Sequence, residues 1–151
     1  MFNFFKSFFG NSTLDSRMHE DAARVMTELD LDMAKSAHEN WKFRLQAYMD
    51  GRSEENLCAE TICFDDRCDL GQWIHGPGQA SLGRFPGFTA LLGHHKMFHY
   101  AASNVVALAK AGKDDAARKM MSQQFEPLSQ SVIADLDSLR QIAATPKTAR
   151  R

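Results

Sequence analysis

Two of the six histidines have a spacing that could hold a metal ion. His95 and His99 are four residues apart, so on a helix both project from one face, about 5–6 Å apart at Cβ. Helices that bind Zn²⁺ use the same spacing. Both residues also lie on an apolar stripe, where two imidazoles are unfavourable unless their nitrogens find partners. His94 is rotated by about 100° and is expected to point elsewhere.

His38 and Cys68 are the other two candidate ligands. His38 lies on the apolar stripe of an earlier helix, where taken alone it is more simply a buried histidine with one hydrogen-bond partner. Cys68 begins a short helix, and both helix N-termini and metal ions favour the thiolate. Cys58 and Cys63 are expected to be small buried apolar residues. Three imidazoles and one thiolate would form a closed tetrahedral set for Zn²⁺.

At these residues the sequence resembles the chemoreceptor zinc-binding (CZB) domain family. The resemblance spans roughly residues 30–135 and is carried by the blocks HENWK at 38–42, CDLGQWI at 68–74 and HKMFH at 95–99. It implies that zinc binds to four residues of this chain: His38, Cys68, His95 and His99. It also implies a bacterial cytoplasmic regulatory domain, often a homodimer, linked to chemoreceptor or diguanylate cyclase signalling partners.

The function that the resemblance implies is sensing rather than catalysis. The signal would be zinc itself, or an oxidant such as hypochlorous acid acting on the zinc-bound Cys68, with an output in chemotaxis or cyclic-di-GMP signalling. Four protein ligands leave no open position for a substrate water, so no enzyme activity is expected. Asp65, Asp66 and Asp69 could accept hydrogen bonds from ligand imidazoles, or could equally cap helices.

Two alternative functions stay open at this point. A metal-dependent enzyme would need a general base and an open site, but Glu39 points about 100° away from its neighbour His38. A di-iron bundle would need Glu-x-x-His pairs, whereas Lys96 and Leu92 occupy the positions three residues before the two histidines. Haem ligation by one of those histidines would leave the Cys68 block without a role.

Composition limits the remaining function classes. A chain of 151 residues has the length of one domain, and it is expected to be a stand-alone sensor. The formal net charge of −1 argues against nucleic-acid binding, which needs concentrated positive charge. Three cysteines are too few for a disulfide scaffold and fit a reducing, cytoplasmic compartment. No run of about 18–20 apolar residues is present to span a membrane.

The apolar periodicity predicts an all-α fold, an up-and-down four-helix bundle with an additional short helix that carries Cys68. One long unbroken helix is expected over 15–50, a second from Ser53 to about Cys63, and a loop over 76–87. A third helix is expected from Pro86 to Gly112, and the last from Asp114. The stripe expected to face the core on the first helix comprises Ala22, Met26, Leu29, Met33, Ala37, Trp41, Leu45 and Tyr48.

Three further features complete the predicted organisation. Pro127 lies inside the last helix, so a kink is expected near Gln123–Gln124. Residues 1–14 form a Phe-rich arm that would pack on the bundle or on a partner subunit, and membrane contact through this arm is the less favoured alternative. The bundle is assigned to residues 15–144, and residues 145–151 are expected to be a disordered basic tail.

Overall fold

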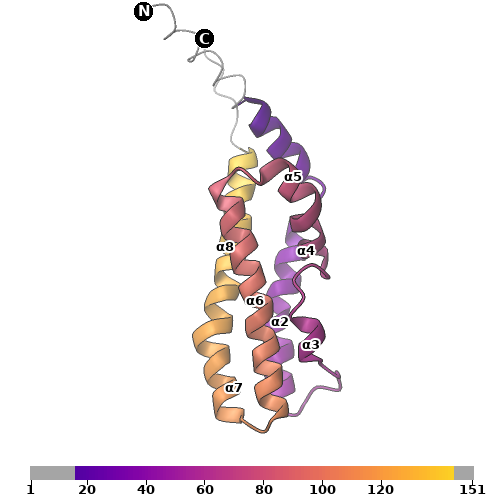
Figure 1. The fold of residues 1–151 in the computed structure, drawn as a ribbon, viewed down its shortest axis with the longest axis vertical. Coiled ribbons are helices and arrows are strands. Elements are labelled where there is room, and N and C mark those ends of the chain that lie inside the picture. Colours follow the sequence, from indigo (N-terminus) through magenta and orange to yellow (C-terminus); the bar gives the residue numbers. More distant parts are fainter. Residues whose placement is uncertain (1–15, 145–151) are drawn as a thin grey trace, which may run out of the picture.

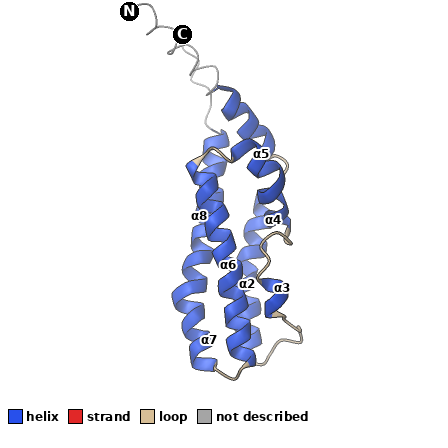
Figure 2. Cartoon of the chain, in the orientation of Figure 1, coloured by secondary structure: helices blue, strands red, loops and turns tan. Residues whose placement is uncertain are grey.

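The computed structural model describes residues 16–144, and within this range the chain is all-α with no strand (Figure 2). The arm at 1–14 and the tail at 145–151 lie outside the described residues. None of the described helices is long and apolar enough to cross a membrane.

The described helices form an up-and-down bundle with one segmented member (Figure 1). Helix α2 (Leu31–Met49) runs down, and three short helices, α3 (Ala59–Ile62), α4 (Asp69–Trp73) and α5 (Gln79–Leu82), return beside it. Helix α6 (Pro86–Lys110) runs down again and packs against α2, α3, α7 and α8. Helices α7 (Asp114–Met120) and α8 (Glu126–Ala144) together form the last ascending member. The predicted four-helix arrangement is thus present, with short helices in the position of one long one.

The prediction of one unbroken helix over 15–50 was wrong. A first helix covers residues 16–26, and α2 begins only at Leu31. The side chain of Asp30 accepts a hydrogen bond from the Met33 backbone N–H at 3.0 Å, which caps α2. The Thr27 hydroxyl donates to the Arg24 carbonyl at 2.6 Å. Polar side chains that bond the local backbone in this way favour caps and turns over a continuing helix.

The break also changes which face of α2 is buried. Met33, predicted to face the core, is 64% exposed, and Ala37 is exposed as well. The residues of α2 that are buried are Leu31, Ala34, His38 and Leu45. A stripe counted from Ala22 assumes one continuous helix, and the turn at 27–30 interrupts it, so Met33 and Ala37 do not face the core. Leu45 of the same stripe is buried, and Trp41 and Tyr48 pack against the core, as predicted.

The helix expected from Ser53 to Cys63 is reduced to α3. The Ser53 hydroxyl accepts the Glu55 backbone N–H at 3.1 Å, which forms a local turn. The Glu55 carboxylate is also held by the Arg44 guanidinium of α2, at 2.6 Å in the shortest contact. These two interactions favour an extended path along α2 over a helix.

The loop expected at 76–87 contains a helix as well. Pro77 lacks a backbone N–H and Gly76 adopts φ −115° and ψ −109°, so the chain kinks through the π-helical turn η1 (Ile74–Gly78) rather than stopping. Helix α5 follows directly. At the end of α4, the Trp73 indole N–H donates to the Val25 carbonyl at 3.1 Å. This bond fastens α4 to the last turn of the first helix.

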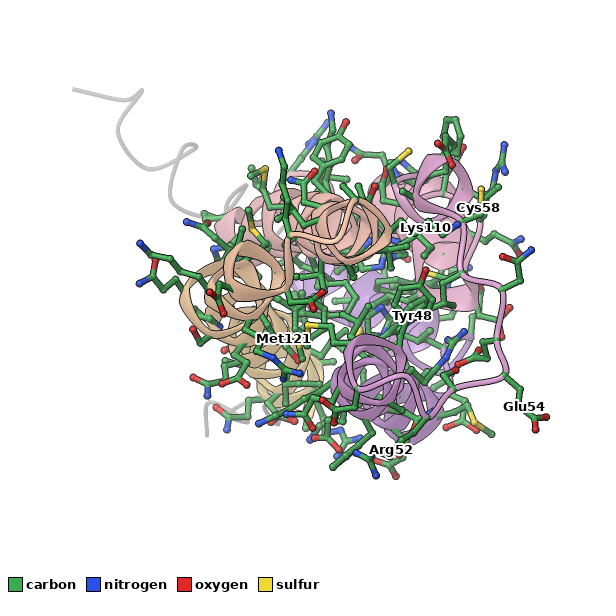
Figure 3. All side chains as sticks on the ribbon, turned by 90° about the horizontal axis from the view of Figure 1, so that it is seen from below. Tyr48, Arg52, Glu54, Cys58, Lys110 and Met121 are labelled. Atoms are coloured by element: carbon green, nitrogen blue, oxygen red, sulfur yellow. The ribbon has the colours of Figure 1, made fainter. Side chains whose placement is uncertain are left out.

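The second half of the fold follows the prediction closely. Helix α6 begins at Pro86, and Gly112 follows its end with a φ of +71° that suits glycine. The last helix begins at Asp114. The turn that precedes Pro127 is π-helical over Met121–Phe125 (η2), and Pro127 has no backbone N–H to continue the α-helical hydrogen bonds there. Seen from below, the interior is filled with side chains, while Arg52 and Glu54 lie at the periphery (Figure 3).

One close approach fixes the position of α4. A Cβ atom at Gly71 would overlap the backbone carbonyl oxygen of Asp65, so the loop before Cys68 lies directly against the first turn of this helix. In contrast, a Cβ at Gly93 on the exposed side of α6 would meet no atom within 4 Å.

These two glycines provide a matched pair of substitutions. Gly71→Ala should lower the free energy of unfolding by about 1–3 kcal/mol, because backbone must move to admit the methyl group. Gly93→Ala should raise it by about 0.5–1 kcal/mol, because alanine favours the helix. Urea denaturation of both variants measures the two changes. Equal stability of the two variants would contradict the close packing of the loop on α4.

Candidate metal centre

Three helices bring the four predicted ligands together. Helix α6 supplies His95 and His99, α2 supplies His38, and Cys68 is the N-cap residue of α4. The three histidines are 3%, 0% and 5% exposed for His38, His95 and His99, and Cys68 is half-buried. One ligand atom from each of the four residues lies within 4.8 Å of the others. Among the described residues, these four side chains form the group that could hold a metal ion.

Four of the six distances between these atoms are close to the edges of a tetrahedron. His95 Nε2 lies 3.2 Å from the Nε2 atoms of both His38 and His99. Cys68 Sγ lies 3.4 Å from His95 Nε2 and 3.7 Å from His99 Nε2. Usual Zn–N and Zn–S lengths in a tetrahedron separate two nitrogens by about 3.3 Å and a nitrogen from a sulfur by about 3.6 Å. These four distances are therefore compatible with a zinc ion, and all the donor atoms lie within 4.8 Å of one another.

Hydrogen bonds to the backbone orient two of the imidazoles. His38 Nδ1 is 2.7 Å from the Ala34 carbonyl, one turn earlier on α2. His99 Nδ1 is 2.8 Å from the Ile62 carbonyl at the end of α3. A carbonyl oxygen only accepts, so the proton of each ring lies on Nδ1 and the lone pair of Nε2 points to the other ligands. Metal-binding histidines are commonly oriented in this way.

Burial sets the charge of these imidazoles. Loss of water contact is the main cause that lowers the pKa of His38 and of His99, and it lowers the pKa of His95 to about 2. The backbone carbonyls beside the first two rings act in the opposite direction. All three rings are therefore neutral at pH 7, the form in which imidazole binds metals.

The sulfur of Cys68 occupies the start of α4. It accepts the backbone N–H of Gly71 at 3.3 Å, as an N-cap side chain does. Burial nevertheless raises the pKa of the Cys68 thiol. A bound cation reverses this effect, because a coordinating thiol is deprotonated. The residues present thus fit a zinc ion, which would be held by three neutral imidazoles and one thiolate.

The other histidines and cysteines lie apart from this cluster. His94 points away, as predicted, and its Nδ1 is 2.6 Å from Asp135 on α8. Cys58 and Cys63 were expected to be buried, but both are only half-buried, and their thiols donate to the side chain and to the backbone carbonyl of Glu60. They lie on the turns of the short α3, which has no buried residue of its own.

Sequence reasoning found the four clustered residues but missed two of their supports. The Ile62 carbonyl belongs to a segment that was expected to lie within a longer helix. Ile62 is the last residue of α3, which ends where the prediction placed the helix end, and a carbonyl in the last turn has no partner within the helix. The Ala34 carbonyl could have been identified, because it lies four residues before His38 on the same helix face.

Comparisons with known proteins agree with this geometry. Residues 38–106 match the family model described as the chemoreceptor zinc-binding domain, and this range contains all four clustered residues. No curated protein and no solved structure gave a significant match.

The buried neutral imidazoles make the stability of the metal-free protein depend on pH. In the unfolded chain a histidine gains a proton below a pKa of about 6.5, whereas His95 in the fold stays neutral down to pH about 2. Folding is therefore most favourable above pH 6.5 and weakens as the pH falls. His95 alone should cost about 1.4 kcal/mol at pH 5.5, with further losses from the two other buried rings.

Urea denaturation of the metal-free protein at pH 7.5 and pH 5.5 measures this loss. The control is His94→Gln, which leaves all three buried imidazoles in place and should show the same decrease. A free energy of unfolding that is constant between the two pH values would contradict the burial of neutral histidines.

Proposed function

We propose that this chain, whose residues 38–106 belong to the chemoreceptor zinc-binding domain family, is a zinc-dependent regulatory protein without catalytic activity. Zinc is the cofactor of this family, and the cluster described above is suited to the ion. In our proposal the ligands are His38, Cys68, His95 and His99. The observation that carries this proposal is the convergence of four donor atoms at tetrahedral spacing.

A closed and buried set of donors supports regulation rather than catalysis. Three of the four side chains are buried, and their oriented lone pairs are directed at one another. A catalytic zinc site usually has three protein ligands and leaves the fourth position to water or substrate. Four protein donors from three separate helices would instead tie the packing of those helices to the presence of the metal.

Zinc content of neighbouring histidine variants tests the ligand assignment. His95→Ala should weaken zinc binding by more than about 100-fold, because removal of a ligand exceeds the effect of removing an outer-shell partner. His94→Ala should bind zinc as the unchanged protein does, because its side chain faces Asp135. Elemental analysis and competition with a chromogenic chelator measure both. Equal loss of zinc in the two variants would refute the assignment.

The proposed signal reaches the rest of the protein through α4. Cys68 begins this five-residue helix, and Trp73 ends it with a hydrogen bond to the Val25 carbonyl of the first helix. A change at the Cys68 sulfur therefore acts on one end of a short element whose other end holds the first helix. The turn at 27–30 allows that helix to move separately from α2.

We further propose that an oxidant such as hypochlorous acid acts on Cys68. The thiolate attacks the chlorine of the acid and displaces hydroxide, which gives a sulfenyl chloride. Water then displaces chloride from the sulfur and loses a proton, so that the sulfur is oxidised to a sulfenic acid and the chlorine is reduced to chloride. Sulfenic acid is a weaker ligand than thiolate and can be reduced again by thiols, which suits a reversible signal. The Gly71 N–H that caps the sulfur would stabilise the anionic form.

Oxidation of the zinc-loaded protein with hypochlorous acid tests this route. We expect trapping with dimedone to label Cys68 first, with zinc release in step, because the metal keeps this sulfur as the nucleophilic thiolate. The double variant Cys58→Ser/Cys63→Ser is the control, and it should release zinc at the same rate. Mass spectrometry and a zinc-responsive dye give the two readouts. Labelling of Cys58 or Cys63 before Cys68, with zinc retained, would contradict a redox signal.

The cellular setting is part of the same proposal. Three unpaired cysteines fit a reducing cytoplasm. Met33 and Phe43 on α2 are 64% and 65% exposed, which supports a homodimer that covers this helix. A chemoreceptor or diguanylate cyclase would receive the signal. The near-neutral net charge supports no nucleic-acid partner.

A further inference from the structure

One nitrogen of the histidine cluster has no acceptor. His95 is fully buried, and its Nδ1 is without a hydrogen-bond partner. The Nδ1 atoms of His38 and His99, in contrast, each contact a backbone carbonyl. If Nε2 of His95 faces a metal, Nδ1 must carry the proton, and a buried N–H without an acceptor costs about 1–3 kcal/mol. The site therefore needs one more acceptor beside this ring.

Asp65 is placed to provide it. Its Oδ2 lies 4.0 Å from His95 Nδ1, about 1 Å beyond hydrogen-bond distance. The side chain of Asp65 is only 16% exposed, and its backbone is fixed against Gly71 of α4. A small rotation of the carboxyl group would close the remaining gap.

His75 holds the same carboxylate from the solvent side. Its Nε2 is 2.8 Å from Asp65 Oδ2, and its side chain is 43% exposed. A carboxylate has about four acceptor positions, so one donor does not exclude a second. His75, Asp65 and His95 thus form a row that runs from the surface to the cluster.

Charge gives a second reason for an acid at this position. A Zn²⁺ ion with three neutral imidazoles and one thiolate has a net charge of +1, and a buried unpaired charge is unfavourable. The carboxylate of Asp65 would balance it. Asp66 and Asp69 are both exposed and so are less suited to this role.

We propose that Asp65 is a positioning residue of the zinc site, whose carboxylate accepts the Nδ1–H of His95 when zinc is bound to Nε2. The proposal rests on the zinc-binding function argued above. The hydrogen bond would fix the orientation and tautomer of the His95 ring and raise the basicity of its Nε2. Outer-shell partners of this kind typically contribute about 10–100-fold to metal affinity.

The test compares adjacent acids in the full chain. Asp65→Asn should weaken zinc binding by about 10–100-fold, because a neutral amide is a weaker acceptor. The matched control Asp66→Asn should bind zinc as the unchanged protein does. Chelator competition measures the affinities, and the cobalt-substituted proteins report by their absorption whether sulfur is still a ligand.

The outcomes separate this inference from the zinc site itself. Weakened binding in Asp65→Asn alone, with the cobalt–thiolate absorption retained, supports the positioning role. Affinity within about threefold of the unchanged protein, or an equal loss in Asp66→Asn, overturns it. Failure of the unchanged protein to show cobalt–thiolate absorption would instead overturn the proposed function.

A measurement on the unchanged protein keeps the inference testable if Asp65→Asn does not fold. In the zinc-loaded protein, a nitrogen-15 correlation spectrum should show the Nδ1–H proton of His95 further downfield than those of His38 and His99, because its acceptor is charged. Asp65→Glu should retain this signal. A His95 proton in the position of the two carbonyl-bonded rings would overturn the proposal.

Discussion

The fold depends on the burial of three imidazoles, with His95 Nε2 at 3.2 Å from the Nε2 atoms of both His38 and His99. Neutral rings in a dry core cost free energy unless their nitrogens are satisfied. His38 and His99 each direct one nitrogen to a backbone carbonyl. The Nε2 atoms of the three rings converge with the sulfur of Cys68, and a metal ion satisfies these four donor atoms at once. At this point of the bundle a zinc ion thus provides the stabilisation that apolar packing would otherwise provide.

This arrangement explains why one member of the bundle is segmented. A long straight helix beside α6 could offer the metal a side chain but neither a capping thiolate nor a free carbonyl. The short α4 presents Cys68 at its N-terminus, and the C-terminal end of α3 leaves the Ile62 carbonyl for His99. The segmented member, α3 to α5, therefore gives the site the Cys68 ligand and the Ile62 carbonyl, both of which come from helix ends. Of its short helices, α3 has no buried residue, whereas α4 buries Leu70, Gly71 and Trp73.

The same segmented side connects the site to the first helix. Asp65, Cys68 and Trp73 lie within nine residues, and each makes a different contact: with the His75 side chain, with the histidine cluster and with the Val25 carbonyl. Long helices with extensive packing, such as α6, resist local change, whereas short elements open at lower free energy. A change at the metal would consequently be felt first in this part of the protein.

The sequence by itself determined the class of fold and the members of the site. Helical periodicity located α6 and the last helix, and the spacing of His95 and His99 placed both rings on one face. Pro127 predicted an irregular turn near Gln123–Gln124, where the structure has the π-helical turn η2. These features are local, because they depend on residues within one or two turns. The family resemblance joined His38 and Cys68 to the pair, and residues 38–106 match the model of the chemoreceptor zinc-binding domain.

Only the tertiary structure decided the rest. Asp30 and Thr27 break the first helix through side-chain bonds to the backbone, and this shifts the buried face of α2 away from Met33. Arg44 on α2 binds the Glu55 carboxylate in the non-helical stretch that precedes α3. Asp65 could not be distinguished from Asp66 or Asp69, because the choice depends on which side chain faces His95. Contacts between different segments decided the positions of Glu55 and Asp65, and the local sequence pattern does not contain such contacts.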